Sequence, residues 1–531
     1  MDIKVSPSVI DDLRTLTGGR LEEAQALSLV AGDTDNIKDY LYDSPSLPEI
    51  RGASILLDKL NGPGIKTVLR QHGLKLSDRF LLFSAGGGFA AIVPAEKARA
   101  VAADIEKLYL DKTASATITT TIINFVPLEG SAQVPFGQIM EHIAHSLRRK
   151  KLNRSAVPFY PVSPFIRRCT SCYLRPVIHT VIREEERLPL CEPCNLKRQV
   201  GLQKRERRDQ ERSPYRNKIL RRLSFPHLSF PRTLADIGTH SARKGYIAVV
   251  AADGNGVGNE LFSRQRPGDY RSFSHGLVKA TEEAVFGVLA DIGKNFLAQR
   301  KIPVEAIVTG GDDALFIVPC QYGLQAAMKV CRQFAEETDR LIHKRLTMSA
   351  GVVIAPENYP MYFLEQMATS LLHSAKRLAR EKQEGCIDFW FLRGQGTMGT
   401  DPLAVRQRML ERSPDSRIRM LFHERPYTLD ELDKLVNFAQ GFVDQDFPRS
   451  RLYGLRQALD VGREHATLFF LYQLARSSKE QQKLLTDFQA KFIARPYSVV
   501  PWNQKREDGQ VTYSTPLVDL VDACDLLRKE Q

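Results

Sequence analysis

The chain of 531 residues has the length of three or four domains, and its composition, 43% hydrophobic and 26% charged, is that of a globular protein. Disordered, collagen-like and small disulfide-stapled proteins are excluded. The longest apolar runs fall far short of the roughly 20 residues that a membrane helix needs, and the first residues lack the cationic and apolar segments of a signal peptide. We therefore expect a cytoplasmic protein without membrane contact, whose eight cysteines are thiols or metal ligands.

The net charge of +13 is concentrated in residues 197–222, where eleven lysines and arginines stand against three acidic residues. Such a cluster neutralises phosphates, which favours nucleic acid as a partner. A solvated basic helix or linker explains the same run of charge, so the segment has two interpretations.

Residues from about 27 to 128 alternate between strand-like and helix-like patterns. The patterns predict, in order, a strand, a helix, a hairpin turning at Gly86-Gly87-Gly88, a helix and a Thr/Ile-rich strand, over residues 26–31, 53–61, 79–94, 95–108 and 116–127.

A second stretch, from about 244 to 393, begins with the same order. It predicts a strand, a helix, a hairpin turning at Gly310-Gly311, a helix, a strand, a helix and a strand, over residues 246–252, 274–294, 306–319, 324–345, 346–355, 362–382 and 387–392. The shared order predicts one α+β unit present twice, each with a ferredoxin-like or palm fold.

The sequence beyond about residue 400 has a helical character. Thr428 and Glu431 form a capping box that opens a helix, and one long helix is predicted over 463–492. We expect an all-helical C-terminal domain without chemistry of its own. The predicted domains are a first palm-like domain, a zinc element with a basic linker, a second palm domain and the helical domain, at residues 1–157, 158–232, 233–400 and 401–531.

Two CxxC pairs, Cys169/Cys172 and Cys191/Cys194, are separated by eighteen residues, which is the spacing of a zinc ribbon. Four thiolates close the coordination of a tetrahedral Zn²⁺, so the predicted site is structural. Four unrelated buried thiols are the alternative. The remaining cysteines have no paired spacing and are expected in or near the core.

A Gly310-Gly311-Asp312-Asp313 turn lies between two apolar strands, and an earlier apolar strand ends in Asp253-Gly254-Asn255-Gly256-Val257-Gly258. Adjacent carboxylates repel each other unless a cation lies between them, and glycines let a backbone approach a polyanion. If the strands are neighbours, Asp253, Asp312 and Asp313 converge on one or two Mg²⁺ or Mn²⁺ ions, as in nucleotidyl transfer. An acidic β-turn without a cation is the alternative.

These two motifs, together with Ser349-Ala350-Gly351-Val352-Val353-Ile354, resemble the palm of CRISPR-associated protein ten, the large subunit of type III CRISPR effectors, and more distantly the GGDEF diguanylate cyclases. Residues 371–376, 47–60 and 83–89 are similar to that family too, as are the four-cysteine element and the helical C-terminal region. The resemblance extends over most of the chain, and the GGDD palm is its most specific part.

The resemblance implies synthesis of cyclic oligoadenylates from ATP, with other type III CRISPR subunits, guide RNA and target RNA as partners. The three aspartates would hold the metal ions on the triphosphate while the 3′-hydroxyl of one ATP attacks the α-phosphate of another and expels pyrophosphate. Lys376 matches a family lysine near the phosphates, although an ordinary exposed helix lysine explains it too. The expected nucleotide-binding residues are Gly310, Gly311, Gly254, Asn255, Gly256 and Lys376.

The sequence departs from the family in three places. Asn255 stands where many members carry a second acid, which lowers the charge available to a cation. The first unit has Gly86-Gly87-Gly88 where the second has its acids, so we expect it to be non-catalytic, with Asp33 and Asp35 as turn residues. No His is followed by Asp, so we expect no HD-type nuclease.

Two other functions remain open. A scaffold of the same family, with a weak or inactive catalytic site, would bind a CRISPR ribonucleoprotein; Asn255 favours it and the intact Asp312 and Asp313 oppose it. A diguanylate cyclase is less well supported, because Asp313 and Ala314 stand where that family has Glu and Phe.

Overall fold

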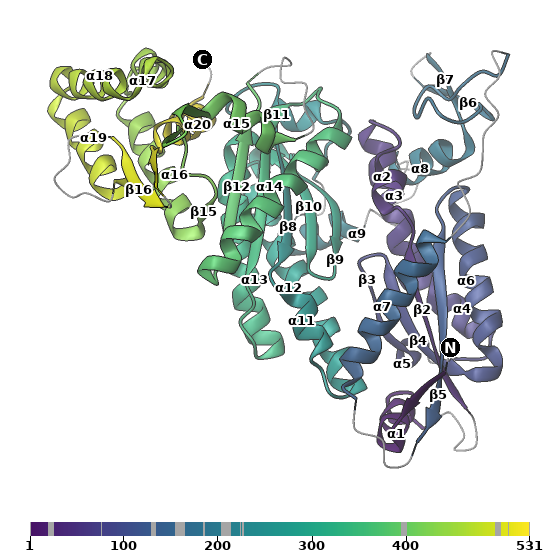
Figure 1. Cartoon of the computed structure of the whole chain (residues 1–531). Helices are drawn as coiled ribbons and strands as arrows, with labels where there is room; N and C mark the ends of the chain where they lie inside the picture. Colours follow the sequence, from purple (N-terminus) through teal and green to yellow (C-terminus); the bar gives the residue numbers. More distant parts are fainter. Residues whose placement is uncertain are drawn as a thin grey trace.

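The computed structural model of the chain (Figure 1) describes residues 2–19, 26–75, 77–128, 134–153, 165–183, 186–202, 214–223, 225, 228–393, 401–493, 501–507 and 509–529. The N-terminal sheet, a second sheet and a C-terminal group of helices follow one another across the molecule, as Figure 1 shows. Within the described residues, no helix combines the length and the apolarity needed to cross a membrane.

The N-terminal unit is built on a five-stranded sheet with the order β1-β5-β2-β4-β3. The central β2 (Leu27–Thr34) runs antiparallel to both β4 (Gly88–Pro94) and β5 (Ile118–Pro127). The edge strands and helices of this unit are β1 (Asp2–Val5), β3 (Leu81–Ala85), α1 (Pro7–Leu16), α2 (Ile37–Tyr42), α3 (Leu47–Lys59), α4 (Ile65–Gln71), α5 (Ser77–Phe80), α6 (Ala98–Thr113) and α7 (Phe136–Leu152).

The second unit is built on a six-stranded sheet with the order β15-β12-β11-β8-β10-β9. Its central β8 (Tyr246–Gly254) is apolar and almost wholly buried, as a strand between two layers of helix must be. The other elements are β9 (Glu305–Gly310), β10 (Asp313–Pro319), β11 (Met348–Pro356), β12 (Cys386–Phe391), β15 (Tyr427–Thr428), α10 (Ala235–Gly238), α11 (Val257–Phe262), α12 (Pro267–Lys294), α13 (Gly323–Ile342) and α14 (Met361–Lys382).

The two sheets share the same pairing register. In the first, β2 pairs with β4 from Leu27 opposite Pro94 to Asp33 opposite Gly88. In the second, β8 pairs with β10 from Ile247 opposite Pro319 to Asp253 opposite Asp313. The central strand therefore reaches the same position relative to the glycine turn in both units, in agreement with the predicted α+β fold. The domain boundaries given above stay a prediction.

Helix α3 holds the N-terminal unit, the cysteine element and the second sheet together. It crosses α8 (Glu192–Leu202) so closely that a Cβ on Gly52 would lie 1.7 Å from the carbonyl oxygen of Lys197, and one on Gly201 1.7 Å from that of Pro48. The Ser54 hydroxyl donates to the carbonyl oxygen of Ile307 in β9. The remaining elements between the sheets are β6 (His179–Arg183), β7 (Glu186–Leu190) and α9 (Pro214–Leu223).

The C-terminal region is mostly helical, but the prediction of an all-helical domain is wrong, because a four-stranded sheet of order β13-β14-β17-β16 lies within it. Its strands are short and largely polar, and β14 pairs with β17 from far along the chain, so no local period marked them. The elements are α15 (Pro402–Leu410), β13 (Glu411–Asp415), β14 (Ile418–Leu421), α16 (Leu429–Asp444), α17 (Arg449–Val461), α18 (Arg463–Arg476), α19 (Lys479–Phe492), β16 (Asn503–Glu507), β17 (Gln510–Ser514) and α20 (Leu517–Leu527).

Two predictions about helix ends have different outcomes. The capping box at the start of α16 is confirmed: the Thr428 hydroxyl accepts from the Glu431 amide, and the Glu431 carboxylate accepts from the Thr428 amide. The prediction of a single helix over 463–492 is wrong. It is two helices, because Ser478 is extended and its hydroxyl caps the amide of Gln481 at the start of α19.

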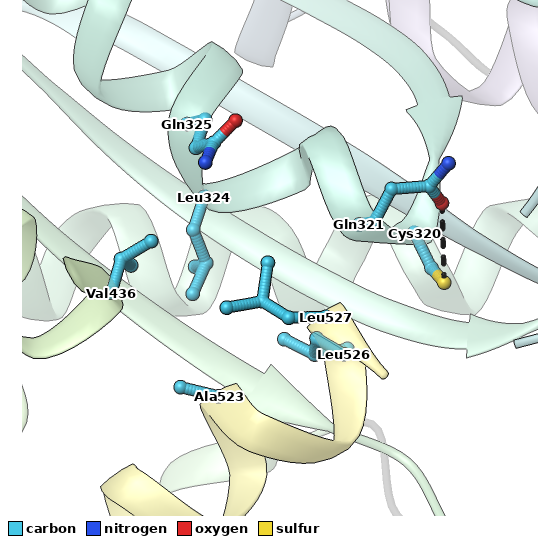
Figure 2. A pocket seen from close by; sticks show the side chains of 8 residues that line it. All are labelled: Cys320, Gln321, Leu324, Gln325, Val436, Ala523, Leu526 and Leu527. Atoms are coloured by element: carbon cyan, nitrogen blue, oxygen red, sulfur yellow. Dashed lines mark hydrogen bonds between the residues drawn. The ribbon is translucent and has the colours of Figure 1, made fainter. Parts of the chain in front are cut away.

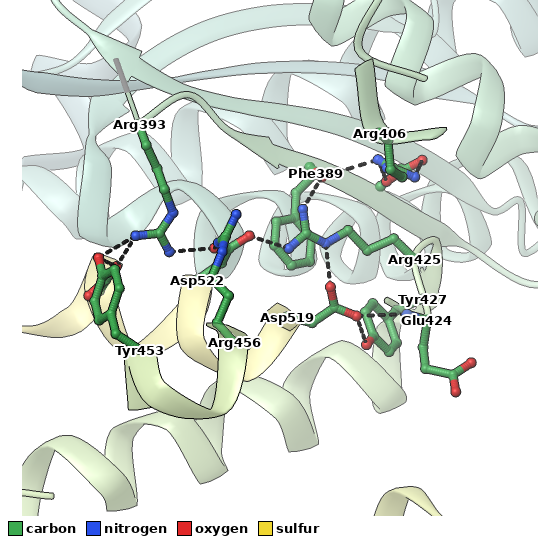
Figure 3. Close-up of polar contacts among 12 residues, drawn as sticks. Phe389, Arg393, Arg406, Glu424, Arg425, Tyr427, Tyr453, Arg456, Asp519 and Asp522 are labelled. Carbon is green, nitrogen blue, oxygen red and sulfur yellow. Dashed lines mark hydrogen bonds and ion pairs between the residues drawn. The ribbon is translucent and has the colours of Figure 1, made fainter. Parts of the chain in front are cut away.

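The C-terminal region is joined to the second sheet by an apolar contact and by buried ion pairs. Leu324 of α13 faces Val436 of α16 and Leu527 of α20 around a cavity of only about 10 Å³ (Figure 2), barely the space of one water molecule. Beside it, Asp522 of α20 accepts from three arginines, Arg393, Arg425 and Arg456 (Figure 3).

The crossing of α3 and α8 predicts that Gly52→Ala destabilises the protein. The new methyl group has no room beside the Lys197 carbonyl, and forcing the helices apart costs about 1–3 kcal/mol or more. Thermal unfolding should show a lowered Tm. Gly62→Ala is the matched control, because a Cβ there meets nothing within 4 Å. Equal Tm values for the two variants would contradict this packing.

Candidate active site and metal centre

Asp253 and Asp313 lie directly opposite each other on the paired strands β8 and β10, so their side chains share one face of the second sheet. Asp312 belongs to the tight turn between β9 and β10 and reaches toward β8, where the Gly254 amide donates to its carbonyl oxygen at 3.1 Å. The strands that carry the three aspartates are thus neighbours, as the sequence required for a shared cation site.

The glycines of both motifs are required by the backbone. A Cβ on Gly254 would lie 2.5 Å from Cγ2 of Val257 and 3.0 Å from Oδ2 of Asp312. Gly256 and Gly311 have φ angles of 67° and 64°, in the left-handed region that favours glycine. The acidic turn is also fixed from α12, where the Thr281 hydroxyl donates to the carbonyl oxygen of Gly311 at 2.9 Å.

Two carboxyl groups of this site resist ionisation in the absence of a cation. Burial, followed by the Asp253 carboxylate, raises the pKa of Asp312 to about 6. Burial, followed by the carboxylates of Asp312 and Asp253, raises the pKa of Asp313 to about 7. A positive charge between these groups relieves both causes, because it replaces lost solvation and separates the negative charges.

The oxygen atoms of the site fit a hard divalent cation such as Mg²⁺ or Mn²⁺. Oδ1 of Asp313 and Oδ1 of Asn255 are buried and accept no hydrogen bond in the described structure, and the Asn255 amide group donates to the Thr347 hydroxyl at 2.9 Å. Within the described residues, only the cysteine cluster brings ligand atoms of three or more residues within 4.8 Å of one another. Joint coordination by the three aspartates therefore requires their side chains to rotate.

Lys376 of α14 lies at the acidic end of β8. Its ammonium group donates to Oδ1 of Asp253 and, at 2.8 Å, to the carbonyl oxygen of Gly254. The helix lysine is therefore part of the aspartate site, rather than an exposed surface residue. Its predicted contact with phosphate stays a prediction.

The first unit contains a counterpart that the sequence did not reveal. Lys151 of α7 donates to Oδ2 of Asp33 at 2.6 Å and to the carbonyl oxygen of Thr34 at 2.7 Å. Because Asp33 has the register position of Asp253, the two lysine–aspartate pairs are equivalent. The prediction that Asp33 is a turn residue is wrong, because it lies in β2. Lys151 was hidden in the basic run at residues 148–151, where no spacing distinguished it.

The glycine turns of the two units touch each other. A Cβ on Gly310 would lie 2.9 Å from the amide nitrogen of Gly86, so only glycine permits this approach of backbone to backbone. The acidic turn of the second unit thus abuts a turn that carries no carboxylate. The carboxylates at the turns are therefore on one side of the contact.

The four predicted cysteines converge. Their sulfur atoms lie within 4.8 Å of one another, all four are buried, and Sγ of Cys172 is 3.7 Å from Sγ of Cys191. Four thiols at this distance are the donor set of a structural Zn²⁺. His179 is paired with Glu192 instead. The element is anchored by Asp43, which accepts from Arg175 and from the wholly buried Lys197, both at 2.7 Å.

The described part of the basic segment is engaged within the chain. Arg198, Arg216, Lys218 and Arg222 form ion pairs with Glu49, Glu305, Glu282 and Glu283 respectively. These pairs leave little free positive charge for a nucleic acid in α8 and α9. The predicted contacts of Lys204, Arg205, Arg207, Arg208 and Arg212 lie outside the described residues.

Residues 246–384 match the family model of Cas10/Cmr2, second palm domain. The chain is similar to "Csm1 in T.onnurineus" (13% identity, TM-score 0.55, covering 96% of this chain and 71% of that one). It is also similar to a chain of the Csm1-Csm4 subcomplex in the type III-A CRISPR-Csm interference complex (13% identity, TM-score 0.53, covering 97% of this chain and 73% of that one). A chain of the Csm1-Csm4 cassette in complex with cA3 is a further match (12% identity, TM-score 0.51, covering 86% of this chain and 66% of that one).

At these identities the solved structures show the fold, and the chain spans about two thirds of the length of the chain bound to cA3. Comparison with curated proteins finds no match. Residues 246–384 therefore resemble a Cas10/Cmr2 second palm domain, and the fold of the chain is similar to that of Csm1. The resemblance indicated by the GGDD motif is confirmed.

The cysteine cluster predicts one zinc ion per chain, measured by elemental analysis of the purified protein. Cys194→Ser should lose the metal and lower the Tm, because a hydroxyl replaces a thiolate ligand. Cys524→Ser changes an equally buried cysteine outside the cluster and should keep the zinc. Zinc bound at the wild-type ratio by Cys194→Ser would contradict the assignment.

The raised pKa of Asp313 predicts that Asp313→Asn stabilises the protein without added Mg²⁺ or Mn²⁺. Its folded pKa of about 7 lies above the ordinary value of 3.8, so folding binds a proton between these pH values and stability falls as pH rises through them. The Tm of the variant should exceed that of wild type at pH 8, and the difference should vanish near pH 4.

Added Mg²⁺ should raise the Tm of wild type at pH 8 more than that of Asp313→Asn, since the cation binds the ionised site. Asp487→Asn, which changes an exposed carboxylate of α19, is the control and should leave the pH profile unchanged. A Tm of Asp313→Asn below that of wild type at pH 8 would show that the ionised Asp313 carboxylate does not destabilise the fold.

Proposed function

We propose that this chain, with its Cas10/Cmr2 second palm domain and Csm1-like fold, is a metal-dependent nucleotidyltransferase that makes cyclic oligoadenylates from ATP in type III CRISPR defence. The observation that supports this most directly is the cluster of Asp253, Asp312 and Asp313 at the ends of neighbouring strands, where burial and the neighbouring carboxylates raise the pKa of Asp312 and Asp313. The match of the palm model and the likeness to a Csm1-Csm4 cassette in complex with cA3 agree with this reaction class.

The three aspartates would hold Mg²⁺ or Mn²⁺, which lowers the pKa of an attacking 3′-hydroxyl and neutralises charge on the pyrophosphate that leaves. Asp253 already pairs with Lys376. A divalent cation would compete with Lys376 for the Asp253 carboxylate, so Lys376 would turn toward the triphosphate. The backbone at Gly254, Gly256, Gly310 and Gly311, together with Asn255, would form the wall along which the phosphates lie.

The equivalent pair of Lys151 and Asp33 supports a role of the first unit in nucleotide contact, without catalysis. Its turn residues 86–88 provide no carboxylate for a metal. Two nucleotides must meet for each bond that forms, and the turns of the two units touch at Gly86 and Gly310. We therefore place the reacting nucleotides where the two units meet.

Other type III CRISPR subunits, guide RNA and target RNA are the proposed partners. The structures that this chain resembles include a Csm1-Csm4 subcomplex in the type III-A CRISPR-Csm interference complex. A Csm4-like subunit is accordingly the first partner to test.

A catalytically weak scaffold of the same family is the second candidate. Asn255 favours it, because its uncharged oxygen offers a cation less than a carboxylate does. The pairing of Asp253 with Lys376 also favours it, since a cation must compete with that lysine for the carboxylate. A diguanylate cyclase has no observation of this kind in its favour.

The function is tested by mass spectrometry of the products formed from ATP with Mg²⁺ or Mn²⁺. Wild type should form cyclic oligoadenylates, and the double variant Asp312→Ala/Asp313→Ala should form none, because the carboxylates that hold the metal are gone. Lys376→Ala should lower the rate at least about tenfold, the effect of losing one charge-assisted hydrogen bond to phosphate. Lys382→Ala, on the exposed end of the same helix, is the matched control.

The same reactions are repeated with partner subunits, guide RNA and target RNA. Absence of product in that complex, with ATP bound normally, would favour the scaffold. Absence of metal-dependent ATP binding in wild type would overturn the assignment of the three aspartates. Product from GTP instead of ATP would indicate a diguanylate cyclase.

A further inference from the structure

A cavity of about 280 Å³ lies in the C-terminal region, where α15, β13, α17 and α20 meet. Its volume is close to the lower end of the roughly 300–1,000 Å³ that small-molecule sites occupy. Arg408, Arg412 and Arg456 line it from three different elements, and Leu410 and Phe422 provide an apolar floor. The site is therefore assembled only in the folded chain.

The charge around this cavity is positive. Arg412 pairs with Asp460, the one acidic lining residue, at 3.2 Å, and both side chains remain well exposed. Arg456 donates to Asp522 at 3.1 Å, but that carboxylate also serves Arg393 and Arg425 (Figure 3). The exposed Arg408 guanidinium has no ion pair within the described residues. Arg412 and Arg456 therefore each have a carboxylate partner, and Arg408 is the lining guanidinium without one in the described part of the chain.

Arg412 is held in position before any ligand binds. One terminal nitrogen, Nη1, donates to the carbonyl oxygens of Arg408, Met409 and Glu411 at 3.1, 3.3 and 2.8 Å. Its guanidinium also lies 5.6 Å from the centre of the Phe422 ring. A cation fixed in this way loses little side-chain entropy on binding, which strengthens its contact with an anion.

We propose that this cavity binds the phosphate monoester of a nucleotide, either free or at the 5′ end of an oligoribonucleotide. Guanidinium groups match phosphate oxygens in pairs, and the lining carries three arginines against one aspartate, an excess of positive charge that suits a phosphate dianion. The apolar floor formed by Leu410 and Phe422 leaves room for the sugar beside the phosphate. This site is independent of the proposed catalytic function.

The test uses the full chain carrying Asp312→Ala/Asp313→Ala without added Mg²⁺ or Mn²⁺, so that metal-dependent binding at the aspartate site is removed. Isothermal titration calorimetry compares AMP with adenosine, and a 5′-phosphorylated oligoribonucleotide with its 5′-hydroxyl form. AMP or the phosphorylated strand should bind, and the partner without phosphate should not. Binding of AMP identifies a free-nucleotide site, whereas binding of the phosphorylated strand alone identifies a strand end.

Three further substitutions in this background locate the ligand. Arg408→Ala should weaken binding at least about tenfold, since a hydrogen bond to a charged group contributes roughly 1.5–3 kcal/mol. Asp460→Asn should strengthen binding, because it removes the one acidic charge from the wall. Arg476→Ala, an exposed arginine of α18, should change nothing.

Three results would overturn the proposal. The first is that no phosphorylated probe binds, and the second is that adenosine and AMP bind with equal affinity. The third is that Arg408→Ala binds the phosphorylated probe with unchanged affinity. Because Arg408 is exposed, circular dichroism and Tm should show an intact fold in that variant, so lost binding reports the site. The outcome does not bear on cyclic oligoadenylate synthesis, which the background substitutions have already disabled.

Discussion

The buried ion pair between Arg51 and Glu305 is the contact on which the arrangement of the whole chain depends. Arg51 of α3 donates from Nε and Nη2 to the two carboxylate oxygens at 2.7 Å, and the same guanidinium reaches the carbonyl oxygens of Gly201 and Pro231. Burial alone would raise the pKa of Glu305, but Arg216 and Arg51 hold it below its usual value. Loss of one partner of such a pair costs about 3–5 kcal/mol, so the first unit, the cysteine element and β9 are fixed together.

This connection leads directly to the acidic turn. Glu305 begins β9, the strand that ends at Gly310, and Cys194 lies in the first turn of α8, the helix that ends beyond Gly201. The position of the four-cysteine cluster is thereby tied, through α8 and α3, to the hairpin that carries Asp312 and Asp313. The four-cysteine cluster, distant in sequence, therefore helps to place the aspartates, because α8 and α3 pack closely at Gly201 and Gly52.

The two units share the same backbone geometry but differ in the charged residues at their glycine turns. Each places a lysine of a late helix on the aspartate at the end of its central strand, Lys151 on Asp33 and Lys376 on Asp253. The second unit adds carboxylates at the turn, where burial and neighbouring carboxylates raise the pKa of Asp312 and Asp313. The acidic groups suited to bind a cation thus belong to the turn of the second unit. At the nearly symmetric contact, the first unit contributes a glycine turn and a lysine.

Local patterns in the sequence determined the hairpins at both glycine turns, the capping box of Thr428 and the cysteine cluster, because each depends on residues close in the chain or on a fixed ligand spacing. Tertiary structure alone decided the rest. The strands β14 and β17 pair across most of the C-terminal region, and Ser478 ends a helix that apolar periodicity would have continued. The role of Lys151 follows from the packing of α7 beside Asp33. The role of Arg51 follows from its ion pair with Glu305, more than 250 positions away in the sequence. Sequence spacing records turns, caps and ligand pairs, whereas contacts between distant segments are set by packing that no local period contains.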